Sequence, residues 1–294
     1  MSGDRADGAV RRALSALRHD PPAVAGMLVL LLLAVVGVAG PWLAPAGIND
    51  VDVDRMLQAP SWAHPFGTDE LGRDVLSRVL MAARVSLQVG LVSVGIALVA
   101  GVTLGLLAGW YRGWLDSLLM RVVDVLFAFP VLLLAVAIVA VLGPGLRTAM
   151  IAVGVVYTPI FARVTRASVL AVREQVFVRA AVAIGTPDRR ILWRHVLPNV
   201  AAPLIVQTSL SLAFAILAEA ALSFLGLGVQ PPAPAWGRML FDGRGFVTEA
   251  WWLGFFPGAA IFLTVLAFNL VGDALRDVLD PRQLTLGEAR RNPA

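Results

Sequence analysis

Six long apolar stretches dominate this sequence and limit what it can fold into. None carries a charge near its centre, and they cover residues 23–43, 85–108, 118–142, 148–170, 200–225 and 251–272. About 20 apolar residues in a helix cross the ~30 Å hydrocarbon core of a bilayer. A lone strand in lipid would leave backbone N–H and C=O groups without partners. We therefore expect an all-α membrane protein with six transmembrane helices.

The composition agrees with a membrane protein and excludes several kinds of chemistry. The chain is 58% hydrophobic and 15% charged, against about 45–50% and about 25% in soluble domains. It has no cysteine, which excludes disulfides and Cys-ligated zinc. It also has no lysine, so it cannot form a Schiff base or supply the lysine of an ATP-binding P-loop. If ATP drives this protein, another chain must bind it. The net charge of +4 is spread over dispersed arginines, which argues against a nucleic-acid binder.

The arginines predict the orientation. With the N-terminus inside, 17 of the 24 fall in inner segments or near inner helix ends, and 7 fall outside. Basic residues collect on the cytoplasmic side, so we expect both termini there, an N-in/C-in arrangement. A cleaved signal peptide is the alternative for the first stretch. Its apolar run exceeds the ~7–15 residues of a signal core, so we expect a retained helix.

These boundaries divide the chain into four parts. We expect a cytoplasmic N-terminal tail (1–22), a first membrane helix with an outer segment (23–84), a core of five membrane helices (85–273) and a cytoplasmic C-terminal tail (274–294). Two features of the core favour close packing and bending. Gly101, Gly105 and Gly109 form a GxxxGxxxG ridge. Prolines at 130, 159, 203 and 257 should kink four helices.

The polar segment 172–200 lies between two apolar stretches and predicts two short helices. Gly185 should end the first helix, since glycine permits unusual dihedral angles. Thr186 is the expected N-cap of the second helix, and Pro187 suits its first turn. The second helix should present a basic face of Arg189, Arg190 and Arg194, and end before Pro198.

This segment resembles the EAA loop of ATP-binding-cassette (ABC) importer permeases, which docks on the ATPase. Arg179 stands where the general motif has Glu, and this departure is similar to the dipeptide, oligopeptide and nickel branch. The resemblance assigns ATPase coupling to the following residues: Arg179, Ala180, Ala181, Gly185, Thr186, Pro187, Asp188, Arg190, Arg194, His195, Leu197 and Pro198. An ordinary amphipathic cytoplasmic loop is the alternative interpretation.

Two further blocks resemble the DppC/OppC-type subunit of the same branch. One is the stretch from His64 to Arg78, which looks like its GTDxxGRDxxSR segment. Here Thr68 is the expected N-cap of a helix lying along the outer membrane surface. His64 has no partner ligands nearby that would favour a metal site. The other block is residues 219–237, at the end of the fifth helix and beyond it.

The resemblance implies a type I ABC importer permease in a bacterial cytoplasmic membrane. Its expected function is to translocate di- or oligopeptides without covalent chemistry. It implies a DppB/OppB-like sister permease, two partner ATPase domains that hold ATP and Mg, and an extracytoplasmic peptide-binding protein. No cofactor is expected in this chain. Import of a nickel chelate or another small solute is one alternative. An ATP-independent secondary transporter is a remote alternative. Ion-coupled carriers usually have paired carboxylates or histidines inside the membrane, whereas here Glu219 is the only deep carboxylate of the fifth helix.

Several single residues are further candidates. Glu219 lines the translocation path or outer gate, or else caps backbone or pairs with a sister-subunit arginine. Arg121 and Asp124 are three residues apart and should form a structural ion pair. The loop 226–250 should face the binding protein, and its docking candidates are Trp236, Arg238, Asp242 and Arg244.

Overall fold

A computed structural model describes residues 20–279, and in this part of the chain every regular element is helical. The long helices are α2 (Pro21–Leu43), α3 (Val75–Tyr111), α4 (Gly113–Phe127), α5 (Val131–Leu142), α6 (Leu146–Arg173), α10 (Ala201–Phe224) and α12 (Trp252–Leu279). The short ones are η1 (Val53–Arg55), α7 (Val176–Ala183), α8 (Asp188–Ile191), η2 (Leu192–Val196), α9 (Leu197–Asn199), α11 (Trp236–Gly243) and η3 (Arg244–Phe246). The predicted tails lie largely outside this range, although α12 extends five residues beyond residue 274.

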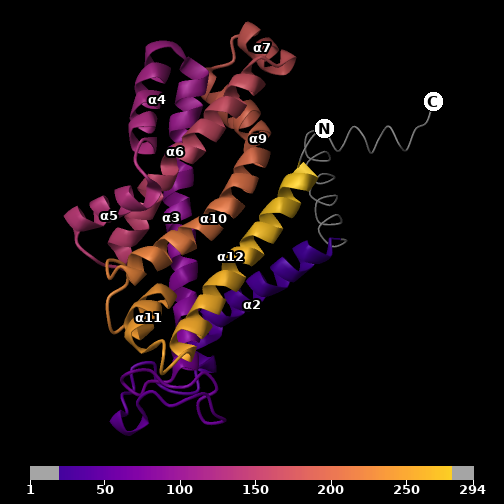
Figure 1. Ribbon diagram of the computed structural model, residues 1–294. Coiled ribbons are helices and arrows are strands. Elements are labelled where there is room, and N and C mark those ends of the chain that lie inside the picture. Colours follow the sequence, from indigo (N-terminus) through magenta and orange to yellow (C-terminus); the bar gives the residue numbers. More distant parts are fainter. Residues whose placement is uncertain (1–19, 280–294) are drawn as a thin grey trace.

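The long helices run alternately up and down an elongated bundle (Figure 1). Five of them are long and apolar enough to cross a membrane, and α4 with α5 makes a sixth span if the bent pair is counted as one. α7 and α8 lie at one end of the bundle, here called the α7 end. The segment 44–74 and α11 lie at the other, here called the α11 end (Figure 1). Counted in this way, the candidate spans match the expected six.

The packing of α3 against α6 confirms the glycine ridge. A Cβ added at Gly105 would lie 2.5 Å from the carbonyl oxygen of Ala162, and one at Gly109 would lie 2.9 Å from Cβ of Val169. On the facing helix, a Cβ at Gly154 would lie 2.9 Å from Cβ of Ile96. Real Cβ atoms essentially never come this close, so the two backbones meet at a distance that only glycine allows.

The start of α3 corrects the predicted outer helix. The cap of this helix is Asp74, whose Oδ2 accepts a hydrogen bond from the backbone N–H of Ser77, and not Thr68. The helix then continues without a break to Tyr111, so the residues from Val75 onward belong to a membrane helix and not to a separate surface helix. Thr68 instead pairs with Asp74 in an isolated β-bridge.

The predicted proline kink is present at Pro130. There α4 and α5 meet at a bend of 92° because Pro130 is the N-cap of α5 and lacks the N–H that would continue α4. Pro159 and Pro257 lie inside α6 and α12. Pro203 lies in the first turn of α10, where a proline needs no kink.

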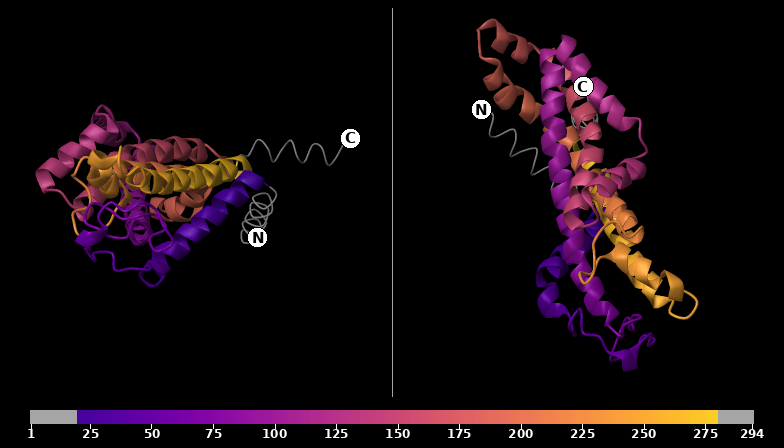
Figure 2. Two further views of the ribbon diagram at one scale, coloured as in Figure 1. Left: turned by 60° about the horizontal axis from the view of Figure 1, so that its bottom comes forward. Right: turned by 90° about the vertical axis from the view of Figure 1, so that its left-hand side faces the viewer.

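α2 and α12 lie side by side along one flank of the bundle (Figure 2). Ala23 near the start of α2 packs with Ala274 near the end of α12, so the two described ends of the chain are adjacent. At the other end, Trp252 Nε1 donates to the carbonyl oxygen of Thr68 at 3.0 Å. This contact places the start of α12 against the segment 44–74.

Candidate functional site

The turn after α7 forms as the sequence predicted. Gly185 has φ +74°, a left-handed value that favours glycine. Its N–H bonds to the carbonyl of Val182 at 2.9 Å, and the N–H of Thr186 bonds to that of Ala181 at 3.1 Å. This pair of bonds is a Schellman motif, which closes the last carbonyls of α7. Gly185 therefore sets the angle between α7 and α8.

The second half of the loop differs from the prediction in two ways. The N-cap of α8 is Pro187, and no side chain caps this helix, so Thr186 does not have the expected role. The helical run also passes through Pro198 and ends at Asn199. It does so by widening into a π-helical turn, η2, in which the N–H of Leu197 bonds to the carbonyl of Leu192. A wider turn accommodates the missing N–H of proline.

The loop rests on a few buried side chains and exposes most of its predicted coupling residues. Val178, Ile191 and Val196 are fully buried and anchor it to the bundle. Exposed residues include the arginines at 179, 189, 190 and 194, and the large apolar side chains of Val176, Ile184 and Trp193. Pro187, Arg189, Arg190 and Trp193 line an open cavity of about 550 Å³. Figure 2 shows this loop projecting from the bundle. The surface therefore combines apolar and basic groups around one hollow.

Glu174 ties α7 to two other elements. Its Oε2 accepts from Nη2 of Arg179 at 2.6 Å, and its Oε1 accepts from Nη2 of Arg112 at 2.8 Å. The hydrogen bonds from Arg179 and Arg112 lower the pKa of the Glu174 carboxyl. Next to it, Arg173 Nη1 donates to the carbonyl of Trp110 at 2.6 Å. The end of α6 thus holds both α7 and the corner between α3 and α4.

The predicted ion pair between Arg121 and Asp124 does not form. Asp124 Oδ1 instead accepts from Nη2 of Arg163 on α6 at 2.6 Å, and within residues 20–279 Arg121 has no ion pair. Arg166 binds both carboxylate oxygens of Asp116, at 2.6 and 2.7 Å. These pairs line a cavity of about 490 Å³ between α4 and α6. Arg163 is 39 residues from Asp124 in the sequence, and tertiary packing brings the two together. The prediction had considered only pairs within one helix.

Glu219 is fully buried, so in this conformation it does not line a path that cargo could reach. Its Oε1 accepts from the hydroxyl of Ser223 at 2.6 Å, and that hydroxyl accepts from the N–H of Val229 at 3.0 Å. Glu219 Oε2 has no hydrogen-bond partner among the described residues. This chain of bonds fixes the turn after α10. Glu219 thus reaches the backbone of this turn only through Ser223, and its place on the translocation path stays a prediction.

The predicted docking residues on and after α11 are mostly unavailable. Trp236 is buried, and its Nε1 donates to the carbonyl of Val79 at 3.0 Å. Arg238 and Asp242 pair with each other at 2.9 Å, with less than a fifth of either side chain exposed. Arg244 is exposed, although its guanidinium lies 3.6 Å from the ring centre of Phe241. Trp236 is thus an anchor of α11 and not a surface contact.

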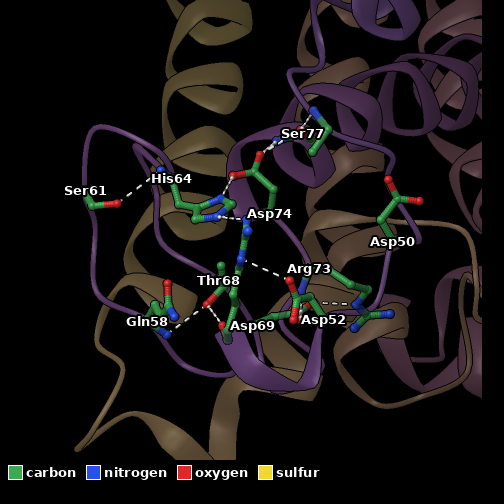
Figure 3. Close-up of polar contacts among 12 residues, drawn as sticks. Asp50, Asp52, Gln58, Ser61, His64, Thr68, Asp69, Arg73, Asp74 and Ser77 are labelled. Carbon is green, nitrogen blue, oxygen red and sulfur yellow. Dashed lines mark hydrogen bonds and ion pairs between the residues drawn. The ribbon is translucent and has the colours of Figure 1, made fainter.

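The segment 44–74 contains a polar network that the sequence did not reveal as a unit (Figure 3). Asp69 receives Arg73 Nε at 2.7 Å and two backbone N–H groups at 2.9 and 3.0 Å. Asp74 receives Ser77 and also contacts Nδ1 of His64 at 3.0 Å. The only sign of this network in the sequence was the many polar residues in the run GTDELGRD. The network gives this loop a fixed shape.

Glu70 provides a test of this network by pH. Burial and the neighbouring Asp69 carboxylate raise its pKa, and Arg73 at 3.0 Å opposes the shift only in part. A raised folded-state pKa stabilises the fold at low pH, and this contribution is lost as the pH rises through that pKa. Relative to Glu70→Gln, the native protein should therefore lose stability as the pH rises from acidic to neutral values. Melting curves of both proteins in detergent across this range would show it. A native protein that gains on the variant as the pH rises would contradict the expectation.

Comparisons with known proteins cover nearly the whole chain. Residues 101–285 match the family described as binding-protein-dependent transport system inner membrane component. Residues 9–60 match the N-terminal transmembrane domain of oligopeptide transport permease C. Among solved structures, an inward-facing conformation of the MetNI methionine ABC transporter aligns with a TM-score of 0.59 at 17% identity, over 70% of this chain and 97% of that chain. At this identity the likeness concerns the fold alone.

Curated relatives match at much higher identity. The dipeptide transport system permease protein DppC of Alkalihalophilus pseudofirmus is 46% identical over 272 residues, which is 92% of this chain and 90% of that protein. The di/tripeptide transport system permease protein DppC of Pseudomonas aeruginosa is 48% identical over 270 residues, 90% and 89% of the two chains. The glutathione transport system permease protein GsiD of Pectobacterium atrosepticum is 46% identical over 266 residues, 90% and 88%.

Proposed function

We propose how this chain works within an ABC importer. It belongs to the family of inner membrane components of binding-protein-dependent transport systems, and it is an ABC importer permease of the oligopeptide permease C type. As such it is a multi-pass inner membrane protein, and ATP is bound and hydrolysed by partner chains. We propose that its cargo is short peptides, because the relatives at 46–48% identity carry dipeptide, di/tripeptide or glutathione transport in their names.

The observation that carries the mechanism is the projecting loop from α7 to α9. Trp193 and Pro187 line a hollow together with two arginines, and the exposed Ile184 lies on the same loop. An apolar centre with a charged rim is the ordinary composition of a protein interface. In this proposal the α7 end faces the cytoplasm and the hollow receives an ATPase. That orientation agrees with the distribution of arginines along the sequence.

Movement of the ATPases would reach the membrane helices by two routes. The first is direct, since α7 to α9 connect the end of α6 to the start of α10. The second passes through Glu174, which holds Arg179 of α7 and Arg112 at the corner between α3 and α4. A rigid-body rotation of these helices would switch the path between its two faces. No step needs covalent chemistry in this chain.

The remaining partners are assigned from surfaces. An apolar groove of about 780 Å³ runs between α3 and α10 beside Trp193. Such a groove at membrane depth suits the helix of a sister permease. The α11 end would then face the extracytoplasmic peptide-binding protein. A complete importer would therefore contain this chain, a sister permease, two ATPase domains and a binding protein.

A reconstitution experiment tests the proposed function. The chain is purified in mild detergent from cells that express its neighbouring transport subunits, and the complex is placed in lipid nanodiscs. We expect co-purification with a second permease and ATPase chains, and ATP hydrolysis that rises when a dipeptide-loaded binding protein is added. The same binding protein without peptide is the control. A chain that purifies alone and moves peptide along an ion gradient without ATP would overturn the proposal.

A further inference from the structure

The cavity of about 490 Å³ between α4 and α6 is lined mainly by charged side chains. Its lining residues are Asp116, Ser117, Met120, Asp124, Arg163 and Arg166. Asp116, Met120 and Asp124 are four residues apart and therefore share one face of α4. Arg163 and Arg166 are three apart and lie together on α6, which runs beside α4 (Figure 1). Two carboxylates thus meet two guanidinium groups, and the cavity has no net charge.

This α4–α6 cavity lies within the membrane-spanning part of the chain. Both α6 and the bent pair of α4 and α5 are candidate spans. Asp124 and Arg163 lie roughly 15 Å along their helices from the α7 end, at about 1.5 Å per residue. Even so, 62% and 47% of their side chains are exposed. Ionisable side chains at such depth avoid lipid, face protein or water-filled cavities, and mark substrate pathways. This face therefore suits the translocation path.

The two ion pairs of the cavity are held differently. Arg166 binds Asp116 through two hydrogen bonds of 2.6 and 2.7 Å, and only 16% of the Asp116 side chain is exposed. This pair fixes α4 against α6. Arg163 reaches Asp124 through one hydrogen bond of 2.6 Å, and its guanidinium lies 4.1 Å from the ring centre of Phe127. A half-exposed pair with a single bond contributes little to stability, so a ligand can replace it at small cost.

The charges of this exchangeable pair determine which ligand suits it. An anion alone would take Arg163 and leave Asp124 without a partner, and a cation alone would do the reverse. An unpaired charge inside a membrane protein is costly. A ligand with both signs replaces one ion pair by two and leaves no charge unpaired. The ends of a free peptide have this chemistry at neutral pH, because the α-carboxyl is ionised and the α-amino group is largely protonated.

We infer that the α4–α6 cavity is a cargo subsite on the translocation path, where Arg163 binds the carboxylate and Asp124 the ammonium of a short peptide. This inference rests on the proposed function and names the part of the cargo that the permease recognises. A planar guanidinium can donate two parallel hydrogen bonds to a carboxylate. The volume lies within the range of about 300–1,000 Å³ for small-molecule sites. Met120 and Phe127 offer apolar contact to the peptide's side chains, so peptides of different sequence are accepted.

The test measures binding of radiolabelled dialanine to the intact importer in nanodiscs, without the binding protein. Two blocked forms are compared with it, one acetylated at its amino end and one amidated at its carboxyl end. The native importer should bind free dialanine at least about tenfold more tightly than either blocked form, as expected for the loss of one charged hydrogen bond. Arg163→Gln should bind the free and amidated forms alike, and Asp124→Asn the free and acetylated forms alike. A residue that only supported the fold would weaken binding of all three peptides equally.

The matched control is Arg55→Gln. Arg55 and Asp52 form a half-exposed ion pair of 3.0 Å in the segment 44–74, outside the cavity. This variant should keep the native preference for free dialanine. The nanodiscs contain no phosphatidylethanolamine, because its headgroup also combines an ammonium with an anion. Soluble glycerophosphoethanolamine is tested separately. If it binds through Arg163 and Asp124 while dialanine does not bind, the cavity receives a lipid headgroup and the inference is overturned.

The outcomes separate the inference from the function on which it rests. A native importer that no peptide-loaded binding protein stimulates would refute the proposed function. An importer that is stimulated, yet binds free and blocked dialanine equally or not at all, would refute the cargo subsite alone. Loss of the preference in Arg55→Gln as well would show that it does not arise in the cavity. Either cavity variant decides the question if the other does not fold.

Discussion

Replacing Gly105 by alanine is expected to separate α3 from α6 and destabilise the bundle by about 2 kcal/mol, near the middle of the range for overpacked cores. The new Cβ would lie 2.5 Å from the carbonyl oxygen of Ala162 and 2.5 Å from Cβ of Thr165. The backbone atom among them belongs to a long helix and cannot rotate away as the end of a side chain could. The two helices must therefore move apart, and their other contacts weaken with them. Leucine at the same position should prevent assembly of a stable bundle.

The same helix offers a matched control. A Cβ added at Gly95 would have no neighbour within 4 Å, so Gly95→Ala introduces the same methyl group into open space. Both substitutions change helix propensity in the same way. Intrinsic tryptophan fluorescence during heating, in detergent, compares the three proteins. The interpretation requires a lower melting temperature for Gly105→Ala only; equal melting temperatures for the two variants would show that α3 and α6 are not in close contact.

Replacing Gly185 by proline is expected to abolish peptide uptake while the membrane bundle stays folded. Proline holds φ near −65°, whereas Gly185 has φ +74° and donates its N–H to Val182. The Schellman turn would open, and α8 would leave its position relative to α7. We expect at least a tenfold loss of peptide-stimulated ATP hydrolysis by the reconstituted importer. The melting temperature should change little, since Gly185 lies in an exposed turn with open space around it.

Two comparisons locate the cause of that loss. Gly185→Ala keeps the N–H and meets open space, so it should cost only the ~1 kcal/mol of a left-handed alanine and retain most of the stimulation. Arg190→Glu leaves the backbone alone and reverses one charge on the rim of the hollow. It should likewise reduce peptide uptake and peptide-stimulated ATP hydrolysis. Full coupled uptake by both Gly185→Pro and Arg190→Glu would show that the ATPase docks elsewhere.

Some features of this protein follow from short-range properties of the chain. The six spans depend on apolar length alone, because a bilayer selects for it regardless of which helices become neighbours. The turn at Gly185 depends on the dihedral freedom of one residue. The absence of lysine excludes a P-loop ATP site in this chain. The GxxxGxxxG spacing also predicted a close helix contact, although it did not say that α6 is the partner.

Other features depend on contacts between residues far apart in the sequence. Asp124 could pair with Arg121 on its own helix, but α6 brings Arg163 into better reach. Trp236 resembled a surface residue in a polar loop until α11 folded against α3 and buried it. Thr68 has a side chain that could cap a helix, but the N-cap is Asp74. The residues between them form the hydrogen-bonded network around Asp69, and the helix begins only after it.

The sequence by itself determined the class of protein, the number of spans, the turn at Gly185 and the glycine ridge. Each of these depends on a residue type within a few positions, or on the length of one apolar run. Only the tertiary structure decided which charges pair, which aromatic side chains are buried and that Asp124 and Arg163 meet in an open cavity between α4 and α6. A residue's exposure and its ion-pair partner depend on which helices pack against it, and local sequence does not contain that information.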